Sequence, residues 1–257
     1  NGGTVTSGST LTINDCGSAI IFVSGTNSLL QLAGAVQFTS KNNGGASTGI
    51  VCNAGTLTSV GSSYVGNNSQ SLGRNLVTVT GHGSSWINSG DITVSSLAGQ
   101  PGNSLLLTTN GLVQCSSLTV GAATATPNTI TANTGGILQF TAATPALTIG
   151  VGSSITMDSA TLSYKGANNV NVNANLGGSG TVGAFTWLGT NTLRLDSSSA
   201  TGSRTFGVTG DPRDYAGIEL YNNVTMAGAI TIDGANGGSL LFSNSVATNV
   251  PGIALLG

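Results

Sequence analysis

Charged side chains are scarce in this sequence. Lysine, arginine, aspartate and glutamate make up 5% of its 257 residues, against about 25% in an average soluble domain. Six basic and eight acidic residues give a formal net charge of −2, and no basic run exists that could neutralise a phosphate backbone. The composition therefore argues against nucleic acid as a partner.

Helix-forming and long apolar segments are missing as well. Gly, Ser, Thr, Asn and Val all have low helix propensity, and no window carries the Ala, Leu, Glu and Lys mixture that helices favour, so almost no α-helix is expected. No apolar run approaches the roughly 20 residues of a membrane-spanning helix, so no membrane span is expected. The first residues lack the charged and apolar regions of a signal peptide, which predicts that a leader was removed earlier or was not needed.

Cysteine is rare and scattered. Cys16, Cys52 and Cys115 lie far apart, among small or apolar residues, and form no C-x-x-C pair. Buried free thiols are the expected state, while one disulfide with an odd thiol stays open if the protein is exported. Neither a metal nor a cofactor is expected.

The residues that are abundant favour short strands joined by tight corners. Thr and Val suit a pleated strand, whereas the 40 Gly residues and the many Asn residues suit tight or left-handed corners. Hydrophobic residues make up 39% of the chain and alternate in order, which a disordered linker would not need. The sequence therefore predicts an all-β protein.

One stretch, residues 77–94, shows the pattern most clearly. It reads VTVTGHGSSWINSGDITV, with a short alternating apolar run at each end and Trp86 amid Gly, Ser and Asn. This pattern predicts strand, turn and strand, forming one coil of a repeating β architecture.

Short internal echoes support stacked coils. Residues 111–115, GLVQC, are echoed about 25 residues later by residues 136–140, GILQF, and earlier by residues 34–38, GAVQF. Residues 118–120, LTV, recur as LTI at 147–149. Such near-constant periods indicate a parallel β-solenoid, and ten or so coils spaced about 4.8 Å apart would form a rod of roughly 50 Å.

One β-solenoid domain is expected over residues 1–257. Inserted loops are expected near 41–46, 67–75 and 202–219, where Gly and Asn, Asn and Ser, or charged residues concentrate. The Asn residues between 168 and 175 suit either side-chain amide ladders between coils or an exposed polar turn. The run Ile20-Ile21-Phe22-Val23 does not alternate, so it needs burial on both faces or a contact with another subunit.

Residues 77–94, followed by LLLTTNGLVQCSSLTVG, resemble the repeat of bacterial autotransporter-like and PEP-CTERM-associated surface proteins. The positions that fit are Gly81, Gly83, Ser84, Trp86, Asn88, Ser89, Gly90, Ile92 and Val94. The match covers about one and a half repeats, and Ser95 stands where the family has Gly. The resemblance implies a right-handed parallel β-helix, an exported bacterial protein and an extracellular or cell-surface location with the leader removed. It implies no catalytic residues.

One sequence motif, Gly81-His82-Gly83, suggests catalysis. It resembles the G-H-G element of polygalacturonases, which are also parallel β-helices and need carboxylates nearby for acid and base work. The chain has no N-T-D, D-D or R-I-K element, so His82 is expected to be a solvent-facing turn residue and the protein is not expected to be an enzyme. A polysaccharide-degrading enzyme that uses His82 and Asp211 is the third hypothesis.

Two further groups of side chains suggest binding. Residues 211–215, Asp-Pro-Arg-Asp-Tyr, suit either a sugar or Ca²⁺ site or, as favoured here, a surface turn in which Arg213 pairs with its acidic neighbours. The aromatic side chains suit either a carbohydrate groove or core packing, and they are Trp86, Trp187, Tyr64, Tyr164, Tyr215 and Tyr221. The second functional hypothesis is therefore an adhesin passenger that binds surface glycans along its lateral face through Tyr, Trp and Asn.

The first hypothesis is a structural subunit of an extracellular bacterial fibre or surface layer, whose partners are copies of itself. Nearly neutral chains do not repel one another, and uncapped solenoid ends or terminal strands can pair with a neighbouring chain. The expected contact residues are Val5, Leu11, Ile13, Leu240, Leu241, Phe242, Ile253, Leu255 and Leu256.

Overall fold

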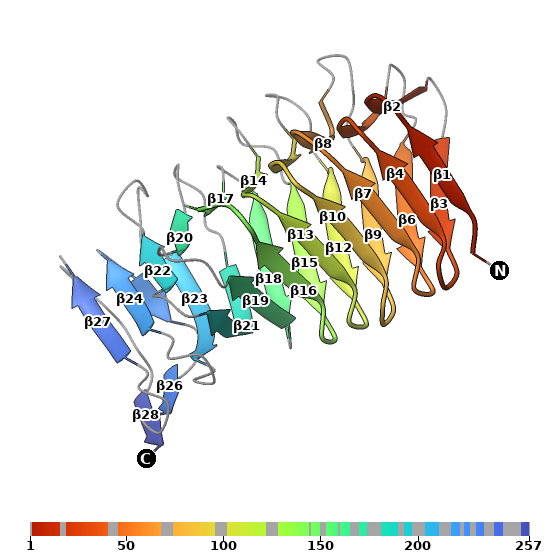
Figure 1. Ribbon diagram of the computed structural model, residues 1–257. Helices are drawn as coiled ribbons and strands as arrows, with labels where there is room; N and C mark the ends of the chain where they lie inside the picture. The colour runs from red at the N-terminus through yellow and green to blue at the C-terminus, as the bar shows by residue number, and fades with distance from the viewer. Residues whose placement is uncertain are drawn as a thin grey trace.

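Strands of a right-handed parallel β-helix make up the computed structural model, as the sequence predicts (Figure 1). It describes residues 2–15, 19–40, 46–67, 74–95, 102–121, 128–143, 145–149, 153–158, 160–164, 170–173, 181–189, 193–196, 204–210, 217–221, 224–226, 230–233, 239–243 and 253–256. Within these residues the secondary structure is β throughout, with no helix.

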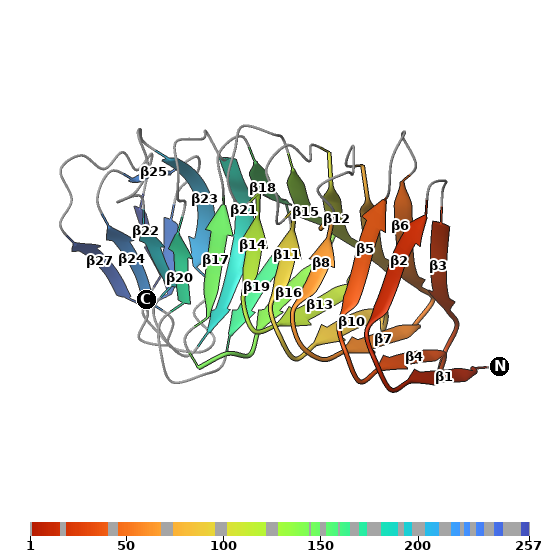
Figure 2. The same ribbon diagram turned by 90° about the horizontal axis from the view of Figure 1, so that it is seen from above.

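Three parallel sheets form the walls of the rod, and each early coil contributes one strand to each wall (Figures 1 and 2). Sheet A comprises β1 (Thr4–Ser7), β4 (Leu29–Leu32), β7 (Thr56–Ser59), β10 (Ser85–Asn88), β13 (Leu112–Cys115), β16 (Ile137–Phe140), β19 (Ala160–Tyr164), β21 (Thr181–Gly189), β23 (Arg204–Gly210) and β25 (Val224–Met226). Sheet B comprises β2 (Leu11–Asp15), β5 (Val36–Ser40), β8 (Ser63–Val65), β11 (Ile92–Val94), β14 (Leu118–Val120), β17 (Ala146–Ile149), β20 (Val170–Asn173), β22 (Leu193–Asp196), β24 (Gly217–Tyr221) and β27 (Ser239–Ser243). Sheet C comprises β3 (Ala19–Ser24), β6 (Ser47–Cys52), β9 (Leu76–Thr80), β12 (Ser104–Thr108), β15 (Thr129–Asn133) and β18 (Ser154–Asp158). A separate pair consists of β26 (Ile230–Asp233) and β28 (Ile253–Leu256).

The register of the strands confirms two of the sequence echoes and corrects a third. Residues 111–115 and 136–140 face each other through β13 and β16, and residues 118–120 face 147–149 through β14 and β17. Residues 34–38, in contrast, lie at the corner before β5 and within it, so this echo belongs to sheet B. The pattern specifies a corner followed by an alternating strand, which all three walls share, and so it cannot identify the wall.

The stretch 77–94 forms one coil, but it holds three strands where the sequence predicts two. Its ends lie in β9 and β11, and the predicted turn contains β10, in which Trp86 points inward. Ser85 and Ile87, on either side of Trp86, face outward. The alternation of apolar and polar residues in β10 is therefore hard to recognise in the sequence, because Trp86 is the one large apolar residue that faces inward.

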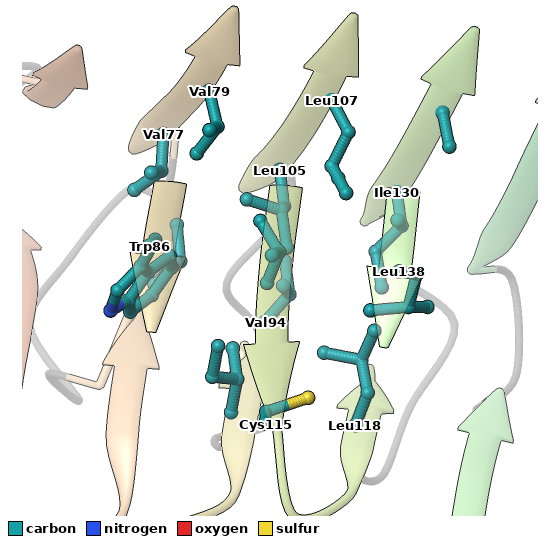
Figure 3. Packing of buried hydrophobic residues seen from close by; sticks show 14 of the residues in the cluster. Val77, Val79, Trp86, Val94, Leu105, Leu107, Cys115, Leu118, Ile130 and Leu138 are labelled. Atoms are coloured by element: carbon teal, nitrogen blue, oxygen red, sulfur yellow. The ribbon is translucent and has the colours of Figure 1, made fainter. Parts of the chain in front are cut away.

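The core is built from columns of inward-facing side chains that run along the axis. Leu57, Trp86, Val113 and Leu138 form such a column in sheet A, because the strand register places each above the next. All four are at most 1% exposed. Figure 3 shows Trp86 and inward-facing residues of the other walls converging on the interior. The rings of Phe38 and Trp86 meet edge to face, with centroids 6.2 Å apart and planes at 76°.

The charged segment predicted as an insertion at 202–219 contains two strands. Residues 204–210 form β23 and residues 217–221 form β24, which continue sheets A and B. Its middle, 211–216, lies outside the described residues, as do 41–45 and 68–73 of the other expected loops. Of the Asn residues between 168 and 175, only Asn171 and Asn173 are described, by the backbone of β20.

Tight two-residue corners join sheet C to sheet A. Between β12 and β13, Thr109 and Asn110 have φ of 53° and 60°, and the Gly111 N–H donates to the Thr108 carbonyl at 3.0 Å. Two consecutive residues with positive φ correspond to a type I′ turn, which Asn and Gly prefer. Threonine is β-branched and rarely adopts this conformation, so Thr109 and the equivalent Thr134, with φ of 49°, are strained.

Replacing Thr109 with a residue that tolerates positive φ should stabilise the protein. We expect Thr109→Asn to raise the free energy of unfolding by about 1 kcal/mol, because the left-handed conformation penalises side chains other than Asn, Asp and Gly by about that amount. Denaturant titration followed by circular dichroism measures the change. Thr119→Asn, within β14, is the matched control and should give no gain; equal gains in both variants would contradict the strain at the corner.

The coils approach too closely at this corner for a side chain at position 111. A Cβ at Gly111 would lie 2.3 Å from the Val79 carbonyl oxygen of the preceding coil, whereas a Cβ at Gly8 would meet nothing within 4 Å. We expect Gly111→Ala to lower the free energy of unfolding by about 1–3 kcal/mol, as overpacking does, and Gly8→Ala to leave it nearly unchanged. Thermal and denaturant unfolding of both variants checks the difference.

Candidate functional site

The first coil, formed by β1, β2 and β3, offers unpaired strand edges. Each of these strands has one hydrogen-bonded neighbour among the described strands, namely β4, β5 or β6, and the coil lies at one end of the rod (Figure 1). An exposed strand edge is a template for another strand. This end is therefore a candidate site of association.

The hydrogen bonds of β1 show which backbone groups are free to pair. The Leu29 N–H donates to the Gly3 carbonyl, and the Ala33 N–H donates to the Ser7 carbonyl, both at 2.9 Å. Because successive residues of a strand direct their backbone groups to opposite neighbours, the N–H and C=O groups of Thr4 and Thr6 face away from β4. These groups are the ones that an added strand would contact.

The first coil also exposes apolar side chains. Val5 stands in the inward-facing column of sheet A, in register with Leu30, yet it is 63% exposed because no described strand covers it. On the outer face of β3, Ile20 and Phe22 are 66% and 61% exposed. These are three of the four large hydrophobic side chains that are exposed in the described part of the chain, and the fourth is Val60.

A hollow of about 300 Å³ lies at the corner where this coil begins. Val5, Ile21, Phe22 and Leu30 are among its lining residues, and polar lining comes only from small hydroxyl residues such as Thr4. The hollow therefore suits an apolar side chain from a partner. Ile20 and Phe22 extend the apolar surface beyond the contacts expected from the sequence, and the unbroken apolar run 20–23 was the signal for them.

The other expected contact residues have different surroundings. Leu11 is half-buried in β2, and Ile13 is 8% exposed. Leu240, Leu241 and Phe242 lie in β27, the last strand of sheet B. Ile253, Leu255 and Leu256 lie in β28, which pairs with β26 outside sheets A and B. The expected contact residues thus belong to three parts of the fold, namely the first coil, the last strand of sheet B and the β26–β28 pair.

Of the residues considered for catalysis, the structure describes His82 but not Asp211. His82 is exposed in the turn between β9 and β10, as predicted, and Asp91 is exposed in the corner before β11. Residues 211–215 lie outside the described part of the chain. Among the described residues, no group of three or more His, Cys, Asp and Glu side chains comes together.

Of the six aromatic residues considered for a carbohydrate groove, the structure describes the side chains of Trp86 and Tyr64. Trp86 is fully buried, and its Nε1–H donates to the Ser59 Oγ at 3.0 Å, so it belongs to the core. Tyr64 is half-buried on the outer face of β8. The side chains of Trp187, Tyr164 and Tyr221 are not described, and Tyr215 lies outside the described residues.

The described cysteines are free thiols. Cys115 is buried in the core, as expected, and burial raises the pKa of its thiol, with the nearby Asp91 charge acting in the same direction. Cys52 is half-buried on the outer face of β6. A thiol with a raised pKa carries little thiolate, so Cys115 is not a nucleophile. Cys16 lies outside the described residues.

The buried polar side chains serve the stacking of the coils. Asn75, Asn103 and Asn128, each fully buried, precede β9, β12 and β15. The Asn103 Oδ1 accepts the Asn75 N–H at 3.1 Å and the Asn75 Nδ2 at 2.8 Å, and the Asn128 Oδ1 accepts the same two groups of Asn103. Ser47 N–H donates to Asn75 Oδ1 at 3.0 Å and extends this asparagine ladder by one coil.

The sequence contains a signal for this ladder that was missed. Each of the three Asn residues stands one position before an apolar strand, in NLVTV, NSLLL and NTITA. For residues 168–175, the density of Asn suggests either amide ladders or an exposed polar turn. Position relative to the strand matters more than density, because only a fixed place in the coil brings equivalent side chains into register.

A second buried network lies where sheet A turns into sheet B. The Ser59 hydroxyl donates to the Asn88 Oδ1 at 2.8 Å while it accepts from Trp86, and the Asn88 Nδ2 donates to the Asp91 carbonyl at 2.9 Å. Ser63 Oγ accepts from the Val36 N–H at 3.1 Å. Since these groups satisfy one another, they hold the corner where sheet A turns into sheet B.

Removal of one ladder member should be costly. We expect Asn103→Ala to lower the free energy of unfolding by about 2–4 kcal/mol, because it leaves two buried donors of Asn75 without an acceptor, at about 1–3 kcal/mol each. Gln139→Ala, on the half-buried outer face of β16, should change it little. Denaturant titration gives both values, and hydrogen exchange should show faster exchange at Asn75 in the first variant only.

The comparisons with known proteins give no relative. No family model matches the chain, no curated protein matches it, and no solved structure matches it. The described residues contain no apolar helix of membrane-spanning length. The resemblance to bacterial surface repeats therefore remains a prediction, and the geometry of the fold is the basis for assigning a function.

Proposed function

We propose that this protein is a structural β-solenoid whose copies associate through the first coil, as subunits of an extracellular fibre or surface layer. The observation that carries the proposal is the exposure of Val5. This residue belongs to a core column, yet its side chain is 63% exposed. Its register partner Leu30 is partly buried, and the next members of the column, Leu57 and Trp86, are fully buried between coils. A strand from a second copy would complete the column in the same way.

The backbone of the first coil supports the same conclusion. The second copy pairs with the N–H and C=O groups of Thr4 and Thr6, which point away from β4. β-Strand addition of this kind takes its affinity from main-chain hydrogen bonds and its specificity from side-chain pockets. The hollow lined by Val5, Ile21 and Leu30 provides such a pocket for an apolar side chain of the partner.

The composition favours assembly over dispersion. Charged residues are 5% of the chain and the net charge is −2, so copies approach one another with little electrostatic repulsion. The extracellular location rests on the resemblance to bacterial surface repeats over residues 77–94. A neutral, strand-rich polymer with satisfied buried networks fits a structural role better than a catalytic one.

Charge at the core column of the first coil should prevent association. We expect Val5→Lys to shift the full chain from assemblies to monomers, because the exposed position tolerates lysine in the monomer while a second copy would bury its charge. Thr6→Pro should act similarly by removing an N–H that faces away from β4. Sedimentation over a range of concentrations, with electron microscopy, measures the assemblies.

Thr93→Lys, at the half-buried outer position of β11, is the matched control and should assemble like the unchanged chain. Circular dichroism must show that all variants keep their strands. Dispersed monomers of the unchanged chain at every concentration would contradict the proposal. Assembly that survives both Val5→Lys and Thr6→Pro would place the contact elsewhere.

A further inference from the structure

A groove on the side of the rod extends from the first coil to the coil that holds β10. Its volume is about 710 Å³, and it crosses successive coils along the corner where sheet A turns toward sheet B. Thr6, Gln31, Thr58 and Ile87 line it from β1, β4, β7 and β10, and the strand register places these four side chains in a single row. Since neighbouring strands are about 4.8 Å apart, the groove is a straight track parallel to the axis.

The chemistry of the groove is neutral and mixed. Its lining contains no charged residue and no histidine. Hydroxyl and amide groups come from Thr6, Gln31 and Ser89, while Val60, 52% exposed, and Ile87 provide apolar surface. A ligand that fits must therefore be uncharged, with hydroxyl groups on its edges and apolar faces between them.

One polar atom of the lining lacks a partner. The Thr58 Oγ1 is shielded from solvent and makes no hydrogen bond, which is costly for a hydroxyl. Its neighbour in the row, Gln31, is exposed, so that side chain is free to turn aside and admit a ligand. A ligand hydroxyl at this point would give the Thr58 hydroxyl the hydrogen-bond partner that it lacks.

We propose that this groove binds a linear, uncharged oligosaccharide that lies along the rod axis. Sugar rings present hydroxyls at their edges and C–H groups on their faces, which match the amide and hydroxyl row and the Val60 and Ile87 surface. The site differs from the aromatic surface expected from the sequence, because Trp86 is in the core and no aromatic residue lines the groove. It does not depend on self-association, since it is formed by one chain.

An extended peptide is a poorer occupant of the same groove. The groove lies on the face of sheet A, where β4, β7 and β10 pair their backbone groups with the coils on both sides and β1 alone has a free edge. A peptide across the strands would lose water from its own N–H and C=O groups without gaining a regular set of partners. An acidic or basic polymer would gain no ion pair from an uncharged lining.

Titration calorimetry of the full chain tests the proposal. The probes are cellohexaose and maltohexaose, which are uncharged, and hexagalacturonate, which is acidic. We expect at least one uncharged probe to bind, and Gln31→Ala and Thr58→Val each to weaken its binding about fivefold, the value of one hydrogen bond. Gln114→Ala is the matched control, because Gln114 continues the row from Ile87 but does not line the groove, and its binding should be unchanged.

Three results would overturn the proposal. They are no heat with either uncharged probe, tighter binding of hexagalacturonate than of both uncharged probes, and equal affinity in the unchanged chain, Gln31→Ala and Thr58→Val. Circular dichroism of each variant shows that the fold is intact. Sedimentation of the same samples reports self-association separately, so failure of saccharide binding is distinguishable from failure of the proposed assembly.

Discussion

Backbone hydrogen bonding between successive coils is the constraint on which the rest of this structure depends. It fixes the coils about 4.8 Å apart and brings equivalent residues into register, so each side chain meets its counterpart in the next coil. Apolar residues such as Leu57, Trp86 and Val113 stack well under this rule, and neutral amides such as Asn75 and Asn103 bond to one another. Columns of like charge would repel at that spacing. The low charge of the sequence is consistent with this requirement.

Where a coil lacks a neighbour, backbone groups that would pair with the next coil have no partner, and core side chains lose their cover. Inside sheets A and B each strand is paired on both sides, and core side chains such as Leu57 and Trp86 are covered, whereas sheet C ends at β18 among the described strands. At the first coil the groups of Thr4 and Thr6 and the side chain of Val5 have no such cover among the described strands. Repeat proteins are stabilised by interfaces between neighbouring units, so adding a unit at this end continues the existing interface and needs no new kind of contact. This is why the exposed coil supports assembly more directly than any side-chain cluster.

The fold was predictable from the sequence because its determinants are local and repeated. Alternation, Gly and Asn corners, and echoes such as GLVQC and GILQF specify strands that stack, and the register of β13 on β16 confirms this. The wall to which a strand belongs was not predictable, because residues 34–38 carry the same pattern in sheet B. Trp86 and the asparagine ladder depend on partners in other coils. The unbroken apolar run 20–23 predicted burial on both faces or a contact with another subunit, and the structure leaves Ile20 and Phe22 exposed on the outer face of β3.

The strand edges of the first coil and the lateral groove on sheet A both result from the stacking of coils, but they suit different partners. A strand edge offers ordered N–H and C=O groups, so its natural partner is another strand, and an apolar residue such as Val5 then selects a partner with a matching core. On the face of sheet A the backbone groups of the inner strands are already paired, so side chains such as Gln31 and Thr58 select a ligand there. Because those side chains repeat with the coils, a ligand gains most if it too repeats along the axis. An assembly that extends the rod would thus leave the lateral groove open, and structural and saccharide-binding roles are compatible in one chain.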